Sequence, residues 1–169
     1  MDRILITGAL GQLGSEFIKY FEKTESYVLA TDIKTPKNKL ECNFEKANAL
    51  DKKKINSLVK KHNINTIYHL VAILSANGEK NPFLSWKLNM DSFQNIAEIS
   101  IENKIKKVFW PSSIAVFGTE SNLDFVSQNP PMNPTTMYGI TKLAGEKLIE
   151  YYFNRFALDI RSLRYPGII

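Results

Sequence analysis

The sequence is poor in cysteine and histidine, because Cys42 is its single cysteine and His62 and His69 are its only histidines. One thiol cannot form an internal disulfide, and so few soft ligands argue against a structural zinc site. We therefore expect no bound metal. The chain also lacks an apolar run of membrane-spanning length and an apolar leader at its N-terminus. We expect no membrane partner and a cytoplasmic location.

Positive charge is in excess but is not concentrated in one segment. The net charge is +5, and the lysines form only short clusters at 52–54, 60–61 and 104–107. A basic balance can indicate nucleic-acid binding, yet no basic stripe interleaved with aromatic residues is visible. We interpret the lysines as a solvated surface and expect no nucleic-acid partner.

Short apolar stretches alternate with amphipathic segments along the chain. Strands are expected at 3–7, 27–32, 39–44, 66–74, 106–113 and 158–166, and helices at 11–23, 50–61, 82–103 and 135–155. This alternation predicts an α/β fold, a doubly wound parallel sheet of about six strands with helices on both faces. The polar, proline-rich segment 118–134 is expected to be a loop.

The stretch "TGALGQLG" places Gly8, Gly11 and Gly14 between the first strand and the first helix. Such a turn lets the backbone approach a pyrophosphate, and the helix N-terminus offers it free N–H groups and a positive dipole end. Asp32 ends the second strand, where a carboxylate accepts hydrogen bonds from the adenosine ribose and repels a 2′-phosphate. The pattern predicts a Rossmann-type dinucleotide site that prefers NAD over NADP.

Tyr138 and Lys142 are four residues apart in "TTMYGITKLAGEKL" and share one helix face. A tyrosine base near pH 7 needs its pKa lowered by about 3 units, or roughly 4 kcal/mol. A lysine ammonium at about 4 Å supplies about that much at an effective dielectric near 20, so we expect Lys142 to lower the Tyr138 pKa. Ser113 ends a central strand, where open α/β sheets bind ligands, and its hydroxyl can hold a substrate oxygen.

These motifs together resemble the extended branch of the short-chain dehydrogenase/reductase superfamily, which includes nucleotide-sugar epimerases and dehydratases. Within that branch, "LSANGEKNP", "FWPSSIAVFG", "TTMYGITK" and "RSLRYPGII" are similar to the short-chain type of L-threonine 3-dehydrogenase. The resemblance implies an oxidoreductase of threonine catabolism, which transfers a hydride from L-threonine to NAD and forms 2-amino-3-oxobutyrate.

The resemblance also implies residue roles. Ser113, Tyr138 and Lys142 align with the catalytic residues of the family, and Ser75, Ser113 and Tyr138 are implied to contact substrate. The residues implied to bind the cofactor are Gly8, Gly11, Gln12, Leu13, Gly14, Asp32, Ile33, Asn43, Phe44, Leu70, Ala72, Asn89, Tyr138, Lys142, Tyr165 and Ile168. His69, Trp86 and Trp110 are interpreted as packing residues.

The resemblance further implies a homodimer, because in this superfamily the two long helices pair across a two-fold axis. Tyr151, Tyr152 and Phe153 fit that interpretation, since one side of a lone helix would not bury all three. We expect residues 1–169 to form an NAD-binding domain that lacks the C-terminal substrate lobe of the family. Two other functions stay open, a nucleotide-sugar epimerase or dehydratase with bound NAD and a non-catalytic NAD-binding module.

Overall fold

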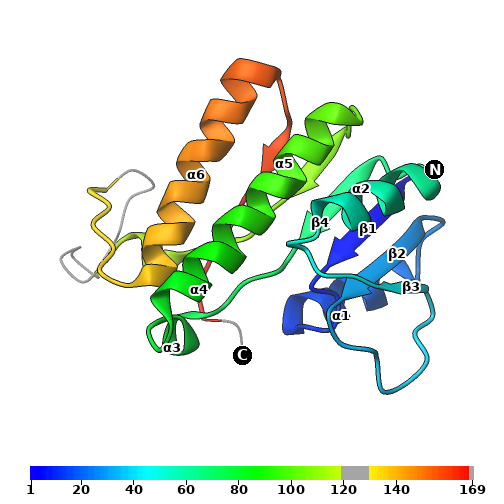
Figure 1. Ribbon diagram of the computed structural model, residues 1–169, viewed down its shortest axis with the longest axis horizontal. Coiled ribbons are helices and arrows are strands. Elements are labelled where there is room, and N and C mark those ends of the chain that lie inside the picture. Colours follow the sequence, from blue (N-terminus) through cyan, green and yellow to red (C-terminus); the bar gives the residue numbers. More distant parts are fainter. Residues whose placement is uncertain (119–129, 168–169) are drawn as a thin grey trace.

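The computed structural model describes residues 1–118 and 130–167 and has a parallel sheet at its centre (Figure 1). The described residues form a six-stranded sheet in the order β3-β2-β1-β4-β5-β7. Its strands are β1 (Arg3–Thr7), β2 (Tyr27–Asp32), β3 (Asn43–Lys46), β4 (Thr66–His69), β5 (Lys107–Phe109) and β7 (Ile160–Arg161). A separate pair joins β6 (Ser112–Ser113) to β8 (Arg164–Tyr165).

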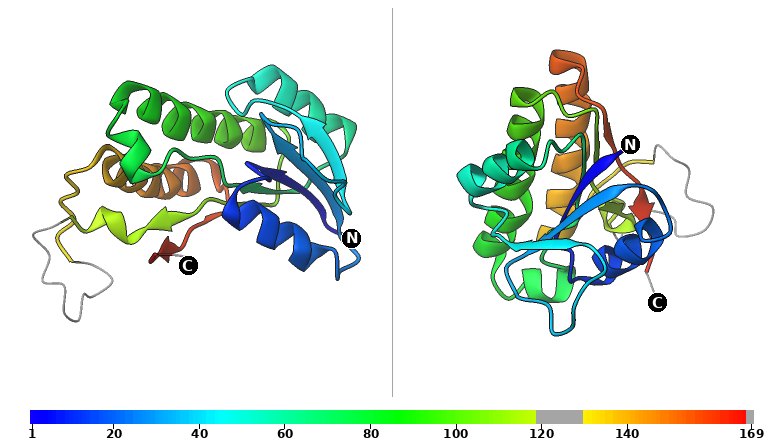
Figure 2. Two further views of the ribbon diagram at one scale, coloured as in Figure 1. Left: turned by 90° about the horizontal axis from the view of Figure 1, so that it is seen from below. Right: turned by 90° about the vertical axis from the view of Figure 1, so that its right-hand side faces the viewer.

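Helices cover both faces of the sheet. They are α1 (Gln12–Phe21), α2 (Lys52–Lys61), α3 (Ser75–Gly78), α4 (Pro82–Trp86), α5 (Ser92–Glu102) and α6 (Met137–Phe156). A π-helical turn, Lys87–Asp91, joins α4 to α5, and a 3₁₀ turn, Ile114–Val116, follows β6. Figure 2 shows α1 on the opposite side of the sheet from α2 and α5.

The alternation of side chains along β1 explains the two layers. Leu5 packs with Ile55 of α2 and Phe93 of α5 in one buried cluster, whereas Ile4 and Ile6 pack with α1 in another. Successive side chains of a strand point to opposite faces, so an uninterrupted apolar strand needs cover on both. The predicted doubly wound α/β fold is therefore confirmed.

The strand order also places the site. β1 lies between β2 and β4. After β1 the chain adds β2 and β3 on one side of that strand, and it then crosses back to add β4 on the other side. Ligands of open α/β sheets bind at the carboxyl ends of the strands, where the order reverses in this way. The expected site is therefore at the ends of β1, β2 and β4.

Four predicted strands differ in extent. The strand expected at 39–44 runs instead from Asn43 to Lys46, and the one expected at 66–74 ends at His69. The segments expected as strands at 106–113 and 158–166 each divide in two, and the second parts form the separate β6–β8 pair. Residues 119–129 of the predicted loop lie outside the described residues. No helix in the described ranges is long and apolar enough to cross a membrane.

Candidate active site

The glycine turn after β1 is packed too closely for side chains at two positions. Gly8 has a φ of +71°, and a Cβ there would lie 3.0 Å from the backbone nitrogen of Val71. A Cβ on Gly14 would lie 2.5 Å from the carbonyl oxygen of Ala9. Gly11 is the N-cap of α1 and has no side chain to satisfy the first N–H groups of that helix. The turn therefore presents bare backbone, as a pyrophosphate site requires.

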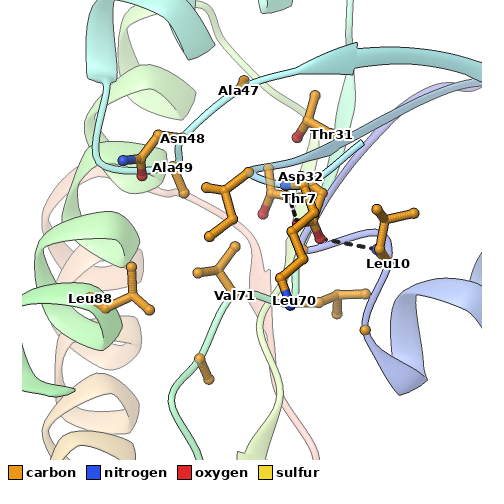
Figure 3. Close-up of a pocket in the computed structure, with 15 residues that line it drawn as sticks. Thr7, Leu10, Thr31, Asp32, Ala47, Asn48, Ala49, Leu70, Val71 and Leu88 are labelled. Carbon is orange, nitrogen blue, oxygen red and sulfur yellow. Dashed lines mark hydrogen bonds between the residues drawn. The ribbon is translucent and has the colours of Figure 1, made fainter. Parts of the chain in front are cut away.

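Asp32 lies at the end of β2 with its carboxylate fixed by two backbone amides (Figure 3). The amide of Leu10 donates to Oδ2 at 3.1 Å, and the amide of Lys34 donates to Oδ1 at 3.0 Å. Asp32 lines a pocket of about 300 Å³. The other residues lining this pocket are Thr7, Gly8, Leu10, Gly11, Thr31, Ile33, Lys34, Ala47, Asn48, Ala49, Leu70, Val71, Ala72 and Leu88.

A second pocket, of about 360 Å³, adjoins the first. The two share Gly8, Gly11, Leu70 and Ala72, so the glycine turn lies between them. The second pocket is also lined by Gln12, Leu13, Gly14, Leu74, Ser75, Pro111, Ser113, Tyr138, Lys142, Tyr165, Pro166 and Gly167. We refer to these two adjoining pockets together as the cleft; Asp32 borders one and Tyr138 borders the other.

Local geometry brings Ser113 and Tyr138 to the same pocket. Ser113 ends β6, and its Oγ accepts a hydrogen bond from the amide of Ala115 at 3.2 Å. Tyr138 lies in the first turn of α6, which the side chain of Thr136 caps. A Cβ on Gly139 would lie 2.4 Å from the carbonyl oxygen of Ala115. Glycine at this position therefore allows α6 to contact the segment that follows Ser113.

Lys142 lies one turn further along α6 and is 2% exposed. Its Nζ donates a hydrogen bond to the carbonyl oxygen of Pro111 at 2.6 Å and lies 4.1 Å from the ring centroid of Trp110. The distance from Nζ to the ring centroid of Tyr138 is 5.5 Å. Burial lowers the pKa of Lys142 to about 7.

The electrostatics of Tyr138 differ from the sequence-based expectation. Burial raises the pKa of Tyr138, and a hydrogen bond with the Ser113 side chain acts in the opposite direction. Lys142 was expected to lower this pKa, but its ammonium contacts Pro111 and Trp110 and is itself partly neutralised by burial. In this structure the hydroxyl of Ser113 is therefore the group that favours the tyrosinate.

The structure does not bring Asn43 and Phe44 to the cleft. Both lie at the beginning of β3, and Asn43 borders a different pocket together with Met1 and Cys42. The carboxyl end of β3 is followed instead by Ala47, Asn48 and Ala49, which line the Asp32 pocket. These three residues, and not the predicted cofactor-binding residues Asn43 and Phe44, therefore border the pocket that contains Asp32.

Sequence reasoning missed Ala47–Ala49, although a signal was present. Asp51 accepts a hydrogen bond from the amide of Lys54 at 2.9 Å and is the N-cap of α2. A cap at this position fixes the start of the helix. The segment immediately before this N-cap, which includes Ala47–Ala49, is then the loop that reaches the cleft.

Asn89, predicted to bind the cofactor, lines neither pocket. It is 1% exposed, and its amide exchanges two hydrogen bonds with the backbone of Ile73 and donates a third to Oγ1 of Thr141. Asn89 therefore fixes the segment after β4 against α6. Ile168 lies outside the described residues. The other predicted site residues line the cleft.

Fold and site together define an α/β dinucleotide-binding domain whose second pocket is lined by Ser113, Tyr138 and Lys142. The sequence profile of the NAD dependent epimerase/dehydratase family matches residues 4–169, so the chain belongs to that family. Its cofactor is NAD. The residues present fit NAD, because the glycine turn leaves room for a pyrophosphate and Asp32 is placed for a ribose.

Relatives of known sequence or structure agree with this assignment. An uncharacterized epimerase/dehydratase of Staphylococcus haemolyticus is 42% identical over 176 residues, which cover 100% of the chain and 54% of that protein. A partial consensus L-threonine 3-dehydrogenase is 41% identical, with a TM-score of 0.95 over 98% of the chain and 54% of its own. The holo form of a GalE-like L-threonine dehydrogenase from Cupriavidus necator is 40% identical, with a TM-score of 0.94 and the same coverage. The chain spans about half the length of these proteins.

Asp32 provides a first test of the cleft. We expect Asp32→Asn to weaken NAD⁺ binding by at least about tenfold, because one charge-assisted hydrogen bond is worth about 1.5–3 kcal/mol. The preference over NADP⁺ should shrink as well, since the repulsion of a 2′-phosphate is removed. Calorimetric titration with both cofactors measures each change, and Asp2→Asn, at an exposed position, is the control. Unchanged selectivity in the Asp32 variant would contradict this role.

Proposed function

We propose that this site oxidises L-threonine to 2-amino-3-oxobutyrate, with NAD⁺ as oxidant. The main observation in support is that Ser113, Tyr138 and Lys142 line the same pocket, which adjoins the glycine turn. Two of the similar structures, at 41% and 40% identity, are L-threonine dehydrogenases by name. A threonine-sized substrate would lie between Ser75 and Tyr138, beside the shared wall of the two pockets.

The chain's own groups have separable roles in this reaction. Bound NAD⁺ would supply the acceptor for the hydride that leaves the β-carbon of threonine. Tyr138 takes the proton of the substrate hydroxyl, and Ser113 hydrogen-bonds the same oxygen. Lys142, when charged, would add to the effect of Ser113 on the tyrosinate, because a nearby cation stabilises an anion. The cofactor is held by the Gly8–Gly14 turn, by Asp32 and by Lys142.

The proposal is tested by NADH formation from NAD⁺ and L-threonine. The assay compares this chain, and any longer natural polypeptide that contains it, with a Ser113→Ala variant of each. We expect threonine-dependent NADH formation that falls by about 10²-fold or more in the variant, the scale of losing one hydrogen bond to a developing oxyanion. Equal rates in wild type and variant, or turnover of a UDP-sugar in place of threonine, would contradict the proposal. The second result would favour a nucleotide-sugar epimerase or dehydratase.

A second candidate is an NAD-binding module without turnover of its own. One observation favours it, since the chain spans about half the length of its relatives. NAD⁺ binding by this chain, with no NADH formed from L-threonine, would identify the module.

We also propose that the protein forms a homodimer through the long helices α5 and α6. On α6, Tyr151 and Phe153 are 55% and 60% exposed, whereas Tyr152 is buried against the core. Exposed aromatic side chains on one helix are typical of an interaction surface. Light scattering gives the molar mass in solution, and a value of one chain at high protein concentration would contradict the dimer.

A further inference from the structure

Lys142 is a buried cation with an incomplete set of partners. Its side chain is 2% exposed, and the Pro111 carbonyl is the hydrogen-bond acceptor of its Nζ. In the ranges 1–118 and 130–167, Lys142 forms no ion pair with a carboxylate. Removing an ammonium from water is costly unless other groups compensate its charge. Some other feature of the site must hold this cation in place.

The indole of Trp110 supplies that feature. The Lys142 Nζ lies 4.1 Å from the centroid of this ring, and Trp110 is fully buried. Phe93 packs against the same indole with ring centroids 4.8 Å apart, which fixes its orientation. Tryptophan is the most favourable aromatic partner for a cation, and the attraction grows when water is excluded.

Gly145 provides the space for this arrangement. It follows Lys142 by three residues on α6, and a Cβ there would lie 2.3 Å from the indole of Trp110. Glycine inside a helix destabilises it by about 1 kcal/mol relative to alanine. Close contact with the indole explains why a glycine stands at a position where helix propensity favours another residue.

We propose that Trp110 is a positioning residue, whose indole face forms with the Pro111 carbonyl a seat that holds the Lys142 ammonium in the cleft. This revises the interpretation of Trp110 as a packing residue only. The seat stands on the geometry of the described residues, whereas its use in turnover rests on the proposed function.

The other titratable groups that face Lys142 do not replace the seat. His69 of β4 is fully buried between Oγ1 of Thr7 and Oγ of Ser92, at 2.7 and 3.0 Å from its two ring nitrogens. Burial and, to a lesser degree, the Lys142 charge lower its pKa to about 3, so it is neutral near pH 7. Tyr138 is also neutral there, because burial raises its pKa. Neither group offers a negative charge to the ammonium, and the Glu146 carboxylate, four residues further along α6, pairs with Arg164 and accepts a hydrogen bond from Ser112.

The seat is tested by lysine titration in isotope-labelled protein. The Cε resonance of Lys142 is identified by its loss in Lys142→Met, and its titration midpoint in the wild type should be near pH 7, far below the ordinary lysine value of 10.5. We expect Trp110→Leu to lower this midpoint by about one pH unit, since a desolvated cation–π contact is worth that much. Trp110→Phe should give a smaller decrease, because it keeps a ring, and it carries the test if the leucine variant does not fold.

Two further variants show whether Trp110 stabilises the Lys142 ammonium or only fills space in the core. Gly145→Ala keeps the indole but displaces it, and should also lower the Lys142 midpoint. Trp86→Leu, at a 43% exposed tryptophan, should leave the midpoint unchanged. An unchanged midpoint in both Trp110 variants, or a raised one, would overturn the proposal, since a rise means that Trp110 only excludes water. No turnover is needed, so a failure to oxidise L-threonine would overturn the proposed function and not the seat.

Discussion

Replacing Tyr138 by phenylalanine is expected to lower the turnover of L-threonine by about 10²–10⁴-fold, the usual contribution of a positioned acid or base. The reason is local, because the hydroxyl that hydrogen-bonds Ser113 is the only group removed. The ring beside Lys142 remains, so α6 should keep its packing. NAD⁺ affinity should change by only a few-fold, since the glycine turn and Asp32 are untouched.

Steady-state assays and calorimetric NAD⁺ titration on the same samples measure the two effects. Tyr20→Phe is the matched control, because Tyr20 lies on α1 with a 64% exposed side chain and outside both pockets. A Tyr138→Phe protein that keeps wild-type turnover would show that the tyrosine is not the base. Equal losses of turnover and NAD⁺ affinity would assign it to cofactor binding.

Replacing Lys142 by methionine is expected to abolish turnover and, at neutral or lower pH, to stabilise the fold by about 1–4 kcal/mol. Methionine has a similar length and leaves no buried charge. Part of the gain is offset, because the carbonyl of Pro111 loses its donor and Trp110 loses its cation. Such a variant would show that this residue is kept for function at the expense of stability.

The pH dependence of stability shows whether the gain comes from removing the buried charge of Lys142 or from better packing of the methionine side chain. Folding lowers the pKa of Lys142 from 10.5 to about 7, so between these values the unfolded chain binds more protons than the native one. Wild-type stability therefore rises with pH across this window. The destabilisation of the fold by the Lys142 charge reaches its full size below about pH 7. The difference between Lys142→Met and wild type should be largest below pH 7 and disappear as pH approaches 10.5.

Denaturant unfolding at several pH values measures this difference. Lys147→Met is the matched control, since Lys147 lies on the same helix with a 68% exposed side chain. It should change stability by less than about 0.5 kcal/mol at any pH. A Lys142→Met difference that is constant with pH would mean that folding does not lower the pKa of Lys142.

The central part of the fold was predictable because its pattern is strong. Strands β1 and β2 have the predicted bounds, since each is an apolar run between polar turns and is buried on both faces. The edge strand β3 was misplaced by several residues. Its side chains are half-buried or exposed, so neither an alternation of apolar and polar residues nor a hydrophobic run marks the residue at which the strand begins.

The site was predictable as a set of residues but not as an arrangement. Helical spacing placed Tyr138 and Lys142 on one face of α6, and the structure confirms that both line the second pocket. The direction of the lysine ammonium was not predictable, because Trp110 and Pro111 hold it from a segment about thirty residues earlier in the chain. Contacts of this kind depend on how β5, β6 and α6 pack against one another, and local sequence patterns do not show that packing.

The central claim is that the glycine turn, Asp32 and the Ser113–Tyr138–Lys142 group form one NAD site within this chain. Calorimetric titration of the chain with NAD⁺, beside NADP⁺, tests it most directly. The account predicts binding of one NAD⁺ per chain and at least about tenfold weaker binding of NADP⁺, the scale of one unfavourable charge contact. A folded sample that binds neither cofactor, or that binds both equally, would contradict it.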